Sequence, residues 1–470
     1  MAKSKILVSF PHFCFFFFPF RCSVRLGPIA DNALIYLCIC HPTLHSLNFS
    51  ITALPAGYRP PKVAIVESDL DALESEADTH VVTTIPPRVV GNPPDPDGNT
   101  EWIVLGKTKQ RVLGTNPAQY QFQPVPKPSG GADNYVIKST PTMGKGVFAT
   151  RDIRMGDIIF AERPLVITPH VISPPLSEMM RRDEELSKYS VEEMFKVFLF
   201  EKELQMEVAV GRMNPERREK FLALTSTGAH TEDGSGPLCG IMHTNLYECS
   251  ELWDGDAKLD LTYLNLYGYR VLCAVGSRIN HRLDSELFDG VRKSVLTLIR
   301  LFSCQPNTVY MFNIRSFSMI FMAGRDIKVG EQIFRSYCPR LTSFAERKLE
   351  LASYDIANCT CASCTNATPE TDALRTNFFT RVREYYFHSE VWNFNGQLPE
   401  DFTLNEMLAF QKAVVNEGLH IEQAYWLYFM KALIVACRLA KMDRELAMNV
   451  EEMKKYLYYH NARMDLMDSE

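Results

Sequence analysis

Hydrophobic and polar positions divide the chain into a part with short apolar runs and parts with helical spacing. The short runs lie between residues 135 and 337 and are YVIKST, GVFATRDI, DIIFAERPLVI, VYMFNI, SFSMIFMAGRDI and EQIFRSY. Such runs, bounded by glycine and charged residues, predict short strands separated by turns. Residues 177–223, 344–357 and 372–467 instead mix charged and apolar residues at helical intervals. The pattern therefore predicts an α+β fold followed by an all-helical C-terminal region.

The first 133 residues follow neither pattern. Residues 1–60 begin with two lysines and the apolar stretch ILVSFPHFCFFFFPF, which superficially resembles a targeting segment or membrane anchor. Pro11 and Pro19 interrupt it, and it is shorter than the ~20 apolar residues of a spanning helix. We favour a disordered tail or an artefact of the gene model, and expect no membrane association. Residues 61–133 contain NPPDPDGNT and PVPKPSGG, which are typical of a disordered linker.

Length, charge and cysteine usage narrow the class of protein. A chain of 470 residues is too long for one compact core, since domains average about 150 residues. The net charge of −6 and the lack of a basic tract argue against direct nucleic-acid binding. Thirteen cysteines, unevenly spread, do not form a secreted disulfide framework. We expect a monomer in a reducing compartment, the nucleus, the cytoplasm or both.

A cluster of cysteines near residue 360 is the strongest sign of metal binding. Cys359, Cys361 and Cys364 place three thiols within six residues. Tetrahedral zinc needs four ligands, so a fourth must come from elsewhere. Three ordinary thiols in a loop are the alternative, but their density in a polar segment favours a metal site. By contrast, Cys239, His243 and Cys249 are too few and too loosely spaced, and we interpret them as ordinary residues.

Three further segments indicate a function only when they are considered together. They are Gly144-Lys145-Gly146, Arg278-Ile279-Asn280-His281 with a later SCQPN, and the GEQIFRSY stretch that ends at Tyr337. A lone G-x-G fits a turn equally well, because glycine permits unusual dihedrals and close backbone approach. With the cysteine cluster, however, these segments resemble the SET-domain family of lysine methyltransferases. Members carry G-x-G, N-H-S-C-x-P-N and G-E-E-(L/I)-x-x-x-Y in this order, and many end in post-SET cysteines.

The resemblance covers about half the chain and implies its organisation. It implies a SET-domain fold of small β-sheets with a pseudoknot. The expected units are a SET domain at 134–340 with a helical insert at about 170–260, a post-SET zinc cluster at 341–366 and a helical region at 367–470. The insert, the cysteines and the helical tail look most like the SMYD-like branch. That branch usually also carries a MYND zinc finger, and none is recognisable here.

The resemblance also implies site residues and an activity. Those implied to contact S-adenosylmethionine are Gly144, Lys145, Gly146, Arg278, Asn280, His281 and Tyr337. Tyr337 is further implied to place its hydroxyl beside the transferred methyl, and Tyr310 to form an aromatic wall of the lysine channel. Cys304 is implied to join Cys359, Cys361 and Cys364 on zinc. The implied activity is methylation of a lysine in a protein substrate, histone or non-histone.

The chemistry accounts for these residue types independently. The amine must be neutral to attack the methyl group, and a free lysine has a pKa of about 10.4. Removing its proton at pH 7 therefore costs about 4–5 kcal/mol. A narrow aromatic channel lowers that pKa by disfavouring the ammonium, and it also aligns the reacting atoms.

An interruption separates the two halves of the N-H-S-C motif. Residues 282–302, RLDSELFDGVRKSVLTLIRLF, stand between His281 and Ser303, and without them the sequence reads SRINHSCQPNTVYMF. The clean join favours an unspliced intron translated in frame. A genuine surface insertion is the alternative, since each doubling of loop length costs only about 0.6 kcal/mol. If the segment is present, the second functional hypothesis is a catalytically impaired SET module that serves as a protein-interaction scaffold.

Overall fold

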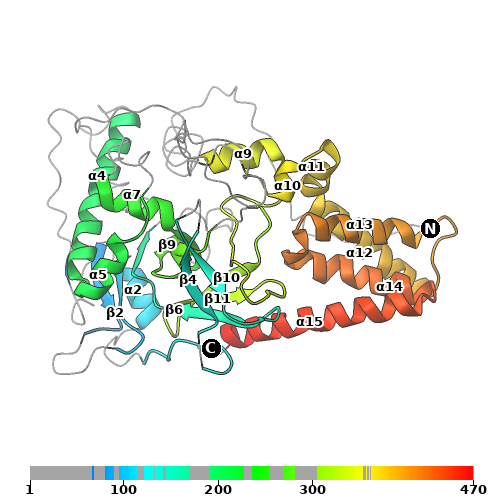
Figure 1. Cartoon of the computed structure of the whole chain (residues 1–470), viewed down its shortest axis with the longest axis horizontal. Coiled ribbons are helices and arrows are strands. Elements are labelled where there is room, and N and C mark those ends of the chain that lie inside the picture. Colours follow the sequence, from blue (N-terminus) through cyan, green and yellow to red (C-terminus); the bar gives the residue numbers. More distant parts are fainter. Residues whose placement is uncertain are drawn as a thin grey trace, which may run out of the picture.

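A computed structural model of the chain shows strands flanked by two groups of helices (Figure 1). The structure describes residues 66–67, 80–88, 95–114, 121–131, 133–140, 144–169, 191–226, 236–253, 268–280, 304–352, 356, 359 and 361–468. Helices α4, α5 and α7 lie at one end beside β2 and α2, strands β4, β6, β10 and β11 lie in the middle, and helices α11 to α14 lie at the other end. The predicted α+β fold with a helical C-terminal region is confirmed.

The largest sheet joins strands that are far apart in the sequence. Its order is β1-β2-β3-β7-β9-β8. The strands are β1 (Val66–Glu67), β2 (His80–Ile85), β3 (Thr100–Leu105), β7 (Val166–Pro169), β9 (Gly268–Leu272) and β8 (Tyr247–Trp253). Neighbours are antiparallel except β1 with β2 and β3 with β7, which are parallel.

The prediction of a disordered linker at 61–133 is wrong for residues 66–67, 80–85 and 100–113, which form strands and a helix. Strands β2 and β3 pair with each other, and β3 continues the sheet through β7. Every residue of β3 is buried, and its Trp102 packs edge-on against Phe317 with ring centroids 5.1 Å apart. Helix α2 (Gly106–Leu113) follows directly. The proline-rich composition between the strands concealed two short apolar runs, which pair with each other and, through β3, with a strand far downstream.

Two smaller sheets hold the strands that the apolar runs predicted. Strands β4 (Tyr135–Ser139) and β5 (Lys145–Ala149) form an antiparallel hairpin. A second sheet has the order β10-β11-β6, with β10 (Thr308–Asn313), β11 (Ser318–Ala323) and β6 (Ile158–Glu162). The run EQIFRSY differs from its prediction, because it forms no extended strand. It pairs through the isolated bridges Phe148–Gln332 and Asn280–Phe334.

The predicted helical insert covers the large sheet. Helices α4 (Val191–Arg212), α5 (Pro215–Leu222) and α7 (Gly236–Asn245) contribute Met206, Phe221 and Met242 to a core shared with Val82 and Ile103 of β2 and β3. Burial of these apolar side chains is the main stabilising contribution of the insert. The insert ends earlier than expected, since strand β8 begins at Tyr247.

The C-terminal region is a bundle of helices that shares a core with Met311 of β10 and with Ile320 and Met322 of β11. Its elements are α9 (Phe344–Ala352), α10 (Ala362–Thr365), α11 (Pro369–Thr376), α12 (Phe378–Asn395), α13 (Leu404–Asn416), η6 (Leu419–Ile421), η7 (Tyr425–Met430), α14 (Lys431–Leu439) and α15 (Asp443–Asp468). Trp426 and Tyr456 stack in its core with ring centroids 5.0 Å apart. Helix α15 runs back beneath the small sheets (Figure 1), where the Tyr458 hydroxyl donates to Asp157 at 3.0 Å.

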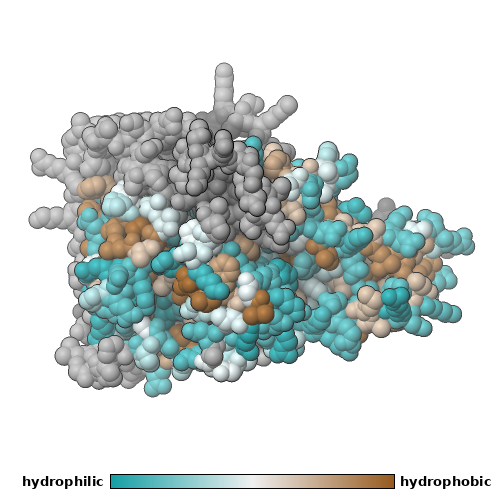
Figure 2. Space-filling view, viewed as in Figure 1, coloured by the Kyte–Doolittle hydropathy of each residue, from teal (hydrophilic) through white to brown (hydrophobic). Residues whose placement is uncertain are grey.

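Several predictions fall outside the described residues. They concern residues 1–60, His281 and the interruption at 282–302, and hence part of the predicted pseudoknot. Within the described ranges, no helix is long and apolar enough to cross a membrane. The face shown in Figure 2 is mostly hydrophilic over the described residues, with separate apolar patches.

Candidate active site and thiol cluster

The G-x-G segment lies against the asparagine of the second motif. Gly144 precedes β5 with φ +66°, a conformation that L side chains rarely adopt. Asn280 donates its side-chain N–H to the carbonyl of Lys145 at 3.0 Å. A Cβ at Gly146 would lie 2.4 Å from Nε2 of Gln332 and 3.1 Å from Nδ2 of Asn280. Glycine at 146 therefore lets the side chains of Gln332 and Asn280 lie against the backbone of the G-x-G segment, which a simple turn would not require.

The second and third motifs pair with each other beside this contact. The Arg335 amide donates to the carbonyl of Asn280 at 2.9 Å, next to the parallel bridge between Asn280 and Phe334. Asn307 holds the same segment, because its Oδ1 accepts from the Phe334 amide at 2.7 Å. Tyr337 reaches back with its hydroxyl to the carbonyl of Ile279 at 3.4 Å. The structure therefore brings together segments that are separated by more than 50 residues.

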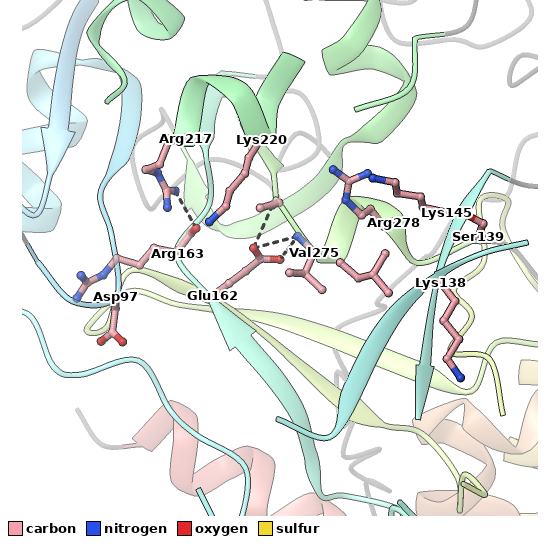
Figure 3. A pocket seen from close by; sticks show the side chains of 12 residues that line it. Asp97, Lys138, Ser139, Lys145, Glu162, Arg163, Arg217, Lys220, Val275 and Arg278 are labelled. Carbon is pink, nitrogen blue, oxygen red and sulfur yellow. Dashed lines mark hydrogen bonds between the residues drawn. The ribbon is translucent and has the colours of Figure 1, made fainter. Parts of the chain in front are cut away.

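A cavity of about 560 Å³ lies on the G-x-G side of this pairing (Figure 3). Lys138, Lys145 and Arg278 line it together with Glu162. Burial lowers the pKa of Arg278. The lysine and arginine side chains give this wall a positive potential suited to a carboxylate. The structure thus places two of the predicted cofactor residues, Lys145 and Arg278, on one cavity.

Glu162 is a feature of this cavity that the sequence did not indicate. Its carboxylate accepts from the backbone N–H groups of Ala274, Val275 and Gly276 at 3.0, 3.0 and 2.6 Å, bonds partly visible in Figure 3. Burial raises the pKa of Glu162, whereas these donors act in the opposite direction. Successive N–H groups that converge on one anion form a nest. The three hydrogen bonds to Glu162 thereby fix the backbone turn that precedes Arg278.

A groove of about 650 Å³ lies on the Tyr310 side of the paired segments. Tyr310 lines it, and so do Arg335, Ser336 and Cys338 from the Tyr337 segment. Tyr310 packs edge-on against Tyr247, with ring centroids 4.8 Å apart. Helix α15 and residues 421–423 of the helical region complete the groove. Tyr337 therefore belongs to a segment that lines the groove, while its hydroxyl contacts the segment that lines the cavity.

Four cysteines converge as the zinc prediction requires. The sulfur atoms of Cys304, Cys359, Cys361 and Cys364 all lie within 4.8 Å of one another. Tetrahedral zinc with Zn–S bonds of about 2.3 Å places its sulfurs about 3.8 Å apart, so the set fits. Hydrogen bonds from the neighbouring thiols, Cys304 first, lower the pKa of Cys361. Within the described residues this is the one group of cysteine, histidine and acidic side chains close enough to hold a metal.

The outcome differs among the predicted residues. Gly146, Lys145, Arg278, Asn280 and Tyr337 come together, Tyr310 lies on the adjoining groove, and the four cysteines form one cluster. His281 lies outside the described residues. Cys239 and Cys249 are buried in the core, as expected for ordinary residues. Sequence reasoning missed Glu162 and Tyr247, which belong to no recognisable motif, and it gave no role to Arg335 within the GEQIFRSY stretch. Only the tertiary pairing reveals these three residues.

Comparison with known proteins identifies part of this architecture. Residues 144–338 match the family described as the SET domain. No curated protein matches the chain. Among solved structures, the Neurospora SET domain protein DIM-5, a histone lysine methyltransferase, is 14% identical with a TM-score of 0.21. That match covers 48% of this chain and 56% of the DIM-5 chain, so the chain spans little more than half of that relative.

A second group of solved structures is matched over more of its length. Rubisco LSMT bound to AdoMet is 14% identical with a TM-score of 0.24, covering 77% of this chain and 91% of that one. The SET domain of LSMT bound to lysine and AdoHcy is also 14% identical, with a TM-score of 0.23 and coverages of 77% and 92%.

Proposed function

We propose that this SET-domain protein is an S-adenosylmethionine-dependent protein lysine N-methyltransferase of the SMYD-like branch, without a recognisable MYND finger. One observation carries the proposal. Tyr337 lies where a segment lining the 560 Å³ cavity pairs with a segment lining the 650 Å³ groove. A transfer between two bound molecules needs such a junction, because the donor and the acceptor must meet at one point.

The cavity has the groups that the cofactor needs. When bound, S-adenosylmethionine supplies an electrophilic methyl group. Arg278 and Lys145 would attract its carboxylate, and the close Gly146 backbone would leave room for it. Nε2 of Gln332 is buried beside Gly146 and has no hydrogen-bond partner among the described residues. This orphaned N–H group lies behind the G-x-G backbone, next to Lys145 of the cavity wall.

The groove has the groups that a lysine needs. Tyr310 and Tyr247 would form the aromatic wall that disfavours the charged ammonium, and the Tyr337 hydroxyl would orient the neutral amine. The substrate is a protein that presents a lysine, histone or non-histone. We further propose a monomer of the nucleus or cytoplasm that does not bind nucleic acid directly.

Zinc at the four cysteines would hold in place the segment from Cys304 to Asn307, which contacts the Tyr337 segment. Cys304 is three residues before Asn307, which holds the Phe334 amide. Bound zinc would tie this segment to the C-x-C-x-x-C segment, and structural zinc contributes directly to folding free energy. Its role here is therefore structural, and no substrate contact is assigned to it.

The test compares Tyr337→Phe with the full wild-type chain. The variant keeps the ring and its packing but loses the hydroxyl at the reacting centre. We expect unchanged S-adenosylmethionine affinity by calorimetry and at least about a hundredfold slower transfer to a lysine peptide library. Tyr385→Phe is the matched control, since its hydroxyl accepts from Arg381 in the helical region. Unchanged turnover in Tyr337→Phe would contradict the assigned role.

A protein-interaction scaffold is the second candidate function. The interruption at 282–302 favours it, and so does a row of exposed apolar side chains on α12, namely Phe387, Val391 and Phe394. A chain that binds no cofactor, with or without residues 282–302, would support this alternative over catalysis.

A further inference from the structure

Arg347 is a buried arginine on α9, the helix that precedes the C-x-C-x-x-C segment. Only 1% of its surface is exposed. Its Nη1 donates to the Thr342 carbonyl at 2.5 Å, and its Nη2 donates to the Ser363 carbonyl at 3.4 Å. The Ser363 carbonyl belongs to the peptide bond that leads into Cys364. The guanidinium therefore lies against the backbone of a cysteine proposed to bind zinc, and α9 lies beside α10 (Figure 1).

Helix α9 turns the face that carries Arg347 toward the thiol cluster. Phe344 and Leu351 lie three residues before and four residues after Arg347, and hence on the same face of the helix. Both pack in the core that also contains Cys304 and Cys364. Burial lowers the pKa of Arg347, but the thiols of Cys304 and Cys364 raise it by more, so the pKa lies above its ordinary value. The arginine and the thiols thus occupy one buried region.

The acidic partner of Arg347 is distant and partly exposed. Within the described residues, Arg347 has a single ion pair, with Asp372 at 3.9 Å, and the Asp372 side chain is 29% exposed. The same Asp372 oxygen accepts from the Phe344 amide at 2.8 Å. By contrast, the neighbouring buried arginine, Arg375, pairs with Glu417 at 2.6 Å. A long, partly solvated ion pair is weak, so Arg347 keeps most of its charge available to the thiols.

Zinc at this cluster would create a buried negative charge. A thiol that coordinates zinc is deprotonated, so four thiolates exceed the charge of the divalent ion by two. Cys304 is 0% exposed and Cys361 is 1% exposed, which leaves water little access to this charge. Burying a net charge is costly unless an opposite charge lies close by. Arg347 is placed to supply that opposite charge.

On the premise that the cluster binds zinc as proposed above, we infer that Arg347 is a positioning residue whose fixed positive charge stabilises the thiolate ligands and raises the affinity of the site for zinc. An opposite charge close to a thiolate favours its ionised form. A purely structural brace would act only through the hydrogen bonds to the Thr342 and Ser363 carbonyls. The two roles respond differently to substitution.

The experiment separates charge from hydrogen bonding with two variants of the full chain. Arg347→Met removes the charge and keeps a long side chain, whereas Arg347→Lys keeps the charge without the planar fork. Zinc affinity is measured at one fixed pH, under reducing conditions, by competition with a chelator of known zinc affinity. Arg347→Met should bind zinc about tenfold more weakly or worse, as is typical when a group that supports metal ligands is removed. Arg347→Lys should retain most of the affinity.

Cobalt in place of zinc gives a readout that packing alone would not move. Co²⁺ bound by thiolates absorbs light through electron transfer from sulfur to the metal. A nearby cation lowers the energy of the sulfur electrons, so its removal in Arg347→Met should move this band to longer wavelength. Arg347→Lys should leave the band near its wild-type position. Neither measurement requires methyl transfer.

A matched control removes a neighbouring buried arginine that has its own carboxylate. Arg375 is 0% exposed and pairs with Glu417, and the Glu417 carbonyl accepts from Ser363 Oγ at 3.4 Å. The double variant Arg375→Met, Glu417→Gln removes both charges and leaves neither unpaired. Its melting temperature should fall, while its zinc affinity and cobalt band stay near those of the wild type. If Arg347→Met does not fold, Arg347→Gln replaces it.

Each outcome has one meaning. Unchanged zinc affinity in Arg347→Met, or weaker binding with an unmoved cobalt band, overturns the inference and leaves the zinc site standing. Equal losses in Arg347→Lys or in the double variant also overturn it, because both retain the charge at position 347. A wild-type chain that binds no zinc overturns the proposed zinc site and the inference with it. A zinc-loaded wild-type chain without methyl transfer contradicts the proposed activity alone.

Discussion

Cys338, the residue after Tyr337, shows how far the role of a single residue can be assigned from sequence. Cys338 Sγ lies 3.8 Å from Cys304 Sγ, yet Cys338 is not part of the four-thiol group. The spacing of C-x-C-x-x-C predicted three ligands, and the resemblance to the SET family implied Cys304 as the fourth. Nothing in the sequence would have excluded Cys338, because only the fold decides which thiols converge.

The first prediction tests this distinction. Cys361→Ala should lose the zinc, since three remaining thiols cannot complete a tetrahedral site. Cys338→Ser should keep one zinc per chain in elemental analysis of protein purified in metal-free buffer. Cys338→Ser is the matched control, because it removes a thiol adjacent to the cluster. Full zinc in Cys361→Ala, or its loss in Cys338→Ser, would contradict the assignment.

His420 supplies a pH dependence of stability. Burial lowers its pKa to about 4, and nearby Arg325 adds to the effect. In the unfolded chain a histidine has a pKa of about 6.5. The folded-state value is the lower one, so the stabilisation is complete above pH 6.5 and is lost as the pH falls toward 4. At pH 5 the loss amounts to about 2 kcal/mol.

The corresponding experiment measures urea unfolding at pH 7 and pH 5. His420→Phe should flatten the difference between the two pH values, because the replacement cannot take up a proton. His388→Gln serves as a control, since His388 is exposed on α12. An identical pH dependence in wild type and His420→Phe would show that another group controls it.

At the scale of elements, sequence patterning identified the strands of the small sheets but missed β2 and β3. The strands of the small sheets are short apolar runs separated by turns, and β4 and β5 pair locally as a hairpin. Strand β3 instead depends on β7, whose residues lie more than 60 positions downstream. The composition averaged over residues 61–133 is dominated by the prolines between the strands, so it predicted a linker. Non-local pairing therefore overrode the local signal, as often happens for strands.

The interruption at 282–302 carries a prediction at this scale. Its flanks are fixed, because Asn280 contacts Lys145 and Cys304 belongs to the thiol cluster. Deleting Arg282–Phe302 makes one short connection between them and should increase both S-adenosylmethionine affinity and the melting temperature. Charged residues such as Asp284 and Glu286 would cost several kcal/mol if buried without partners.

The measurement is a side-by-side calorimetric and thermal comparison of the two chains. Equal affinity and equal melting temperature would show that residues 282–302 form a tolerated surface insertion. The argument for an unspliced intron would then lose its physical support.

For the whole molecule, the groove belongs to two parts of the chain at once. One wall comes from residues 144–338, which match the SET-domain family, through Tyr310 and Arg335. The other wall includes Tyr456, Tyr459 and His460 of α15. Sequence patterning predicted the C-terminal helices but gave no indication of where they would pack. That depends on the close approach of α15 to the turn before β6. The shape of the groove is therefore coupled to the docking of this helix.

Gly156 is the point at which this docking can be tested. A Cβ at Gly156 would lie 2.7 Å from the Tyr459 Cα, and the residue has φ +90°. Gly330 has a similar φ of +80°, but nothing lies within 4 Å of its Cβ position. Both substitutions by alanine incur the left-handed backbone strain of about 1–2 kcal/mol. Only Gly156→Ala should also push α15 away, so it should lower the melting temperature further and speed hydrogen exchange in α15. Equal effects of the two substitutions would show that α15 packs loosely there and that the groove does not depend on this contact.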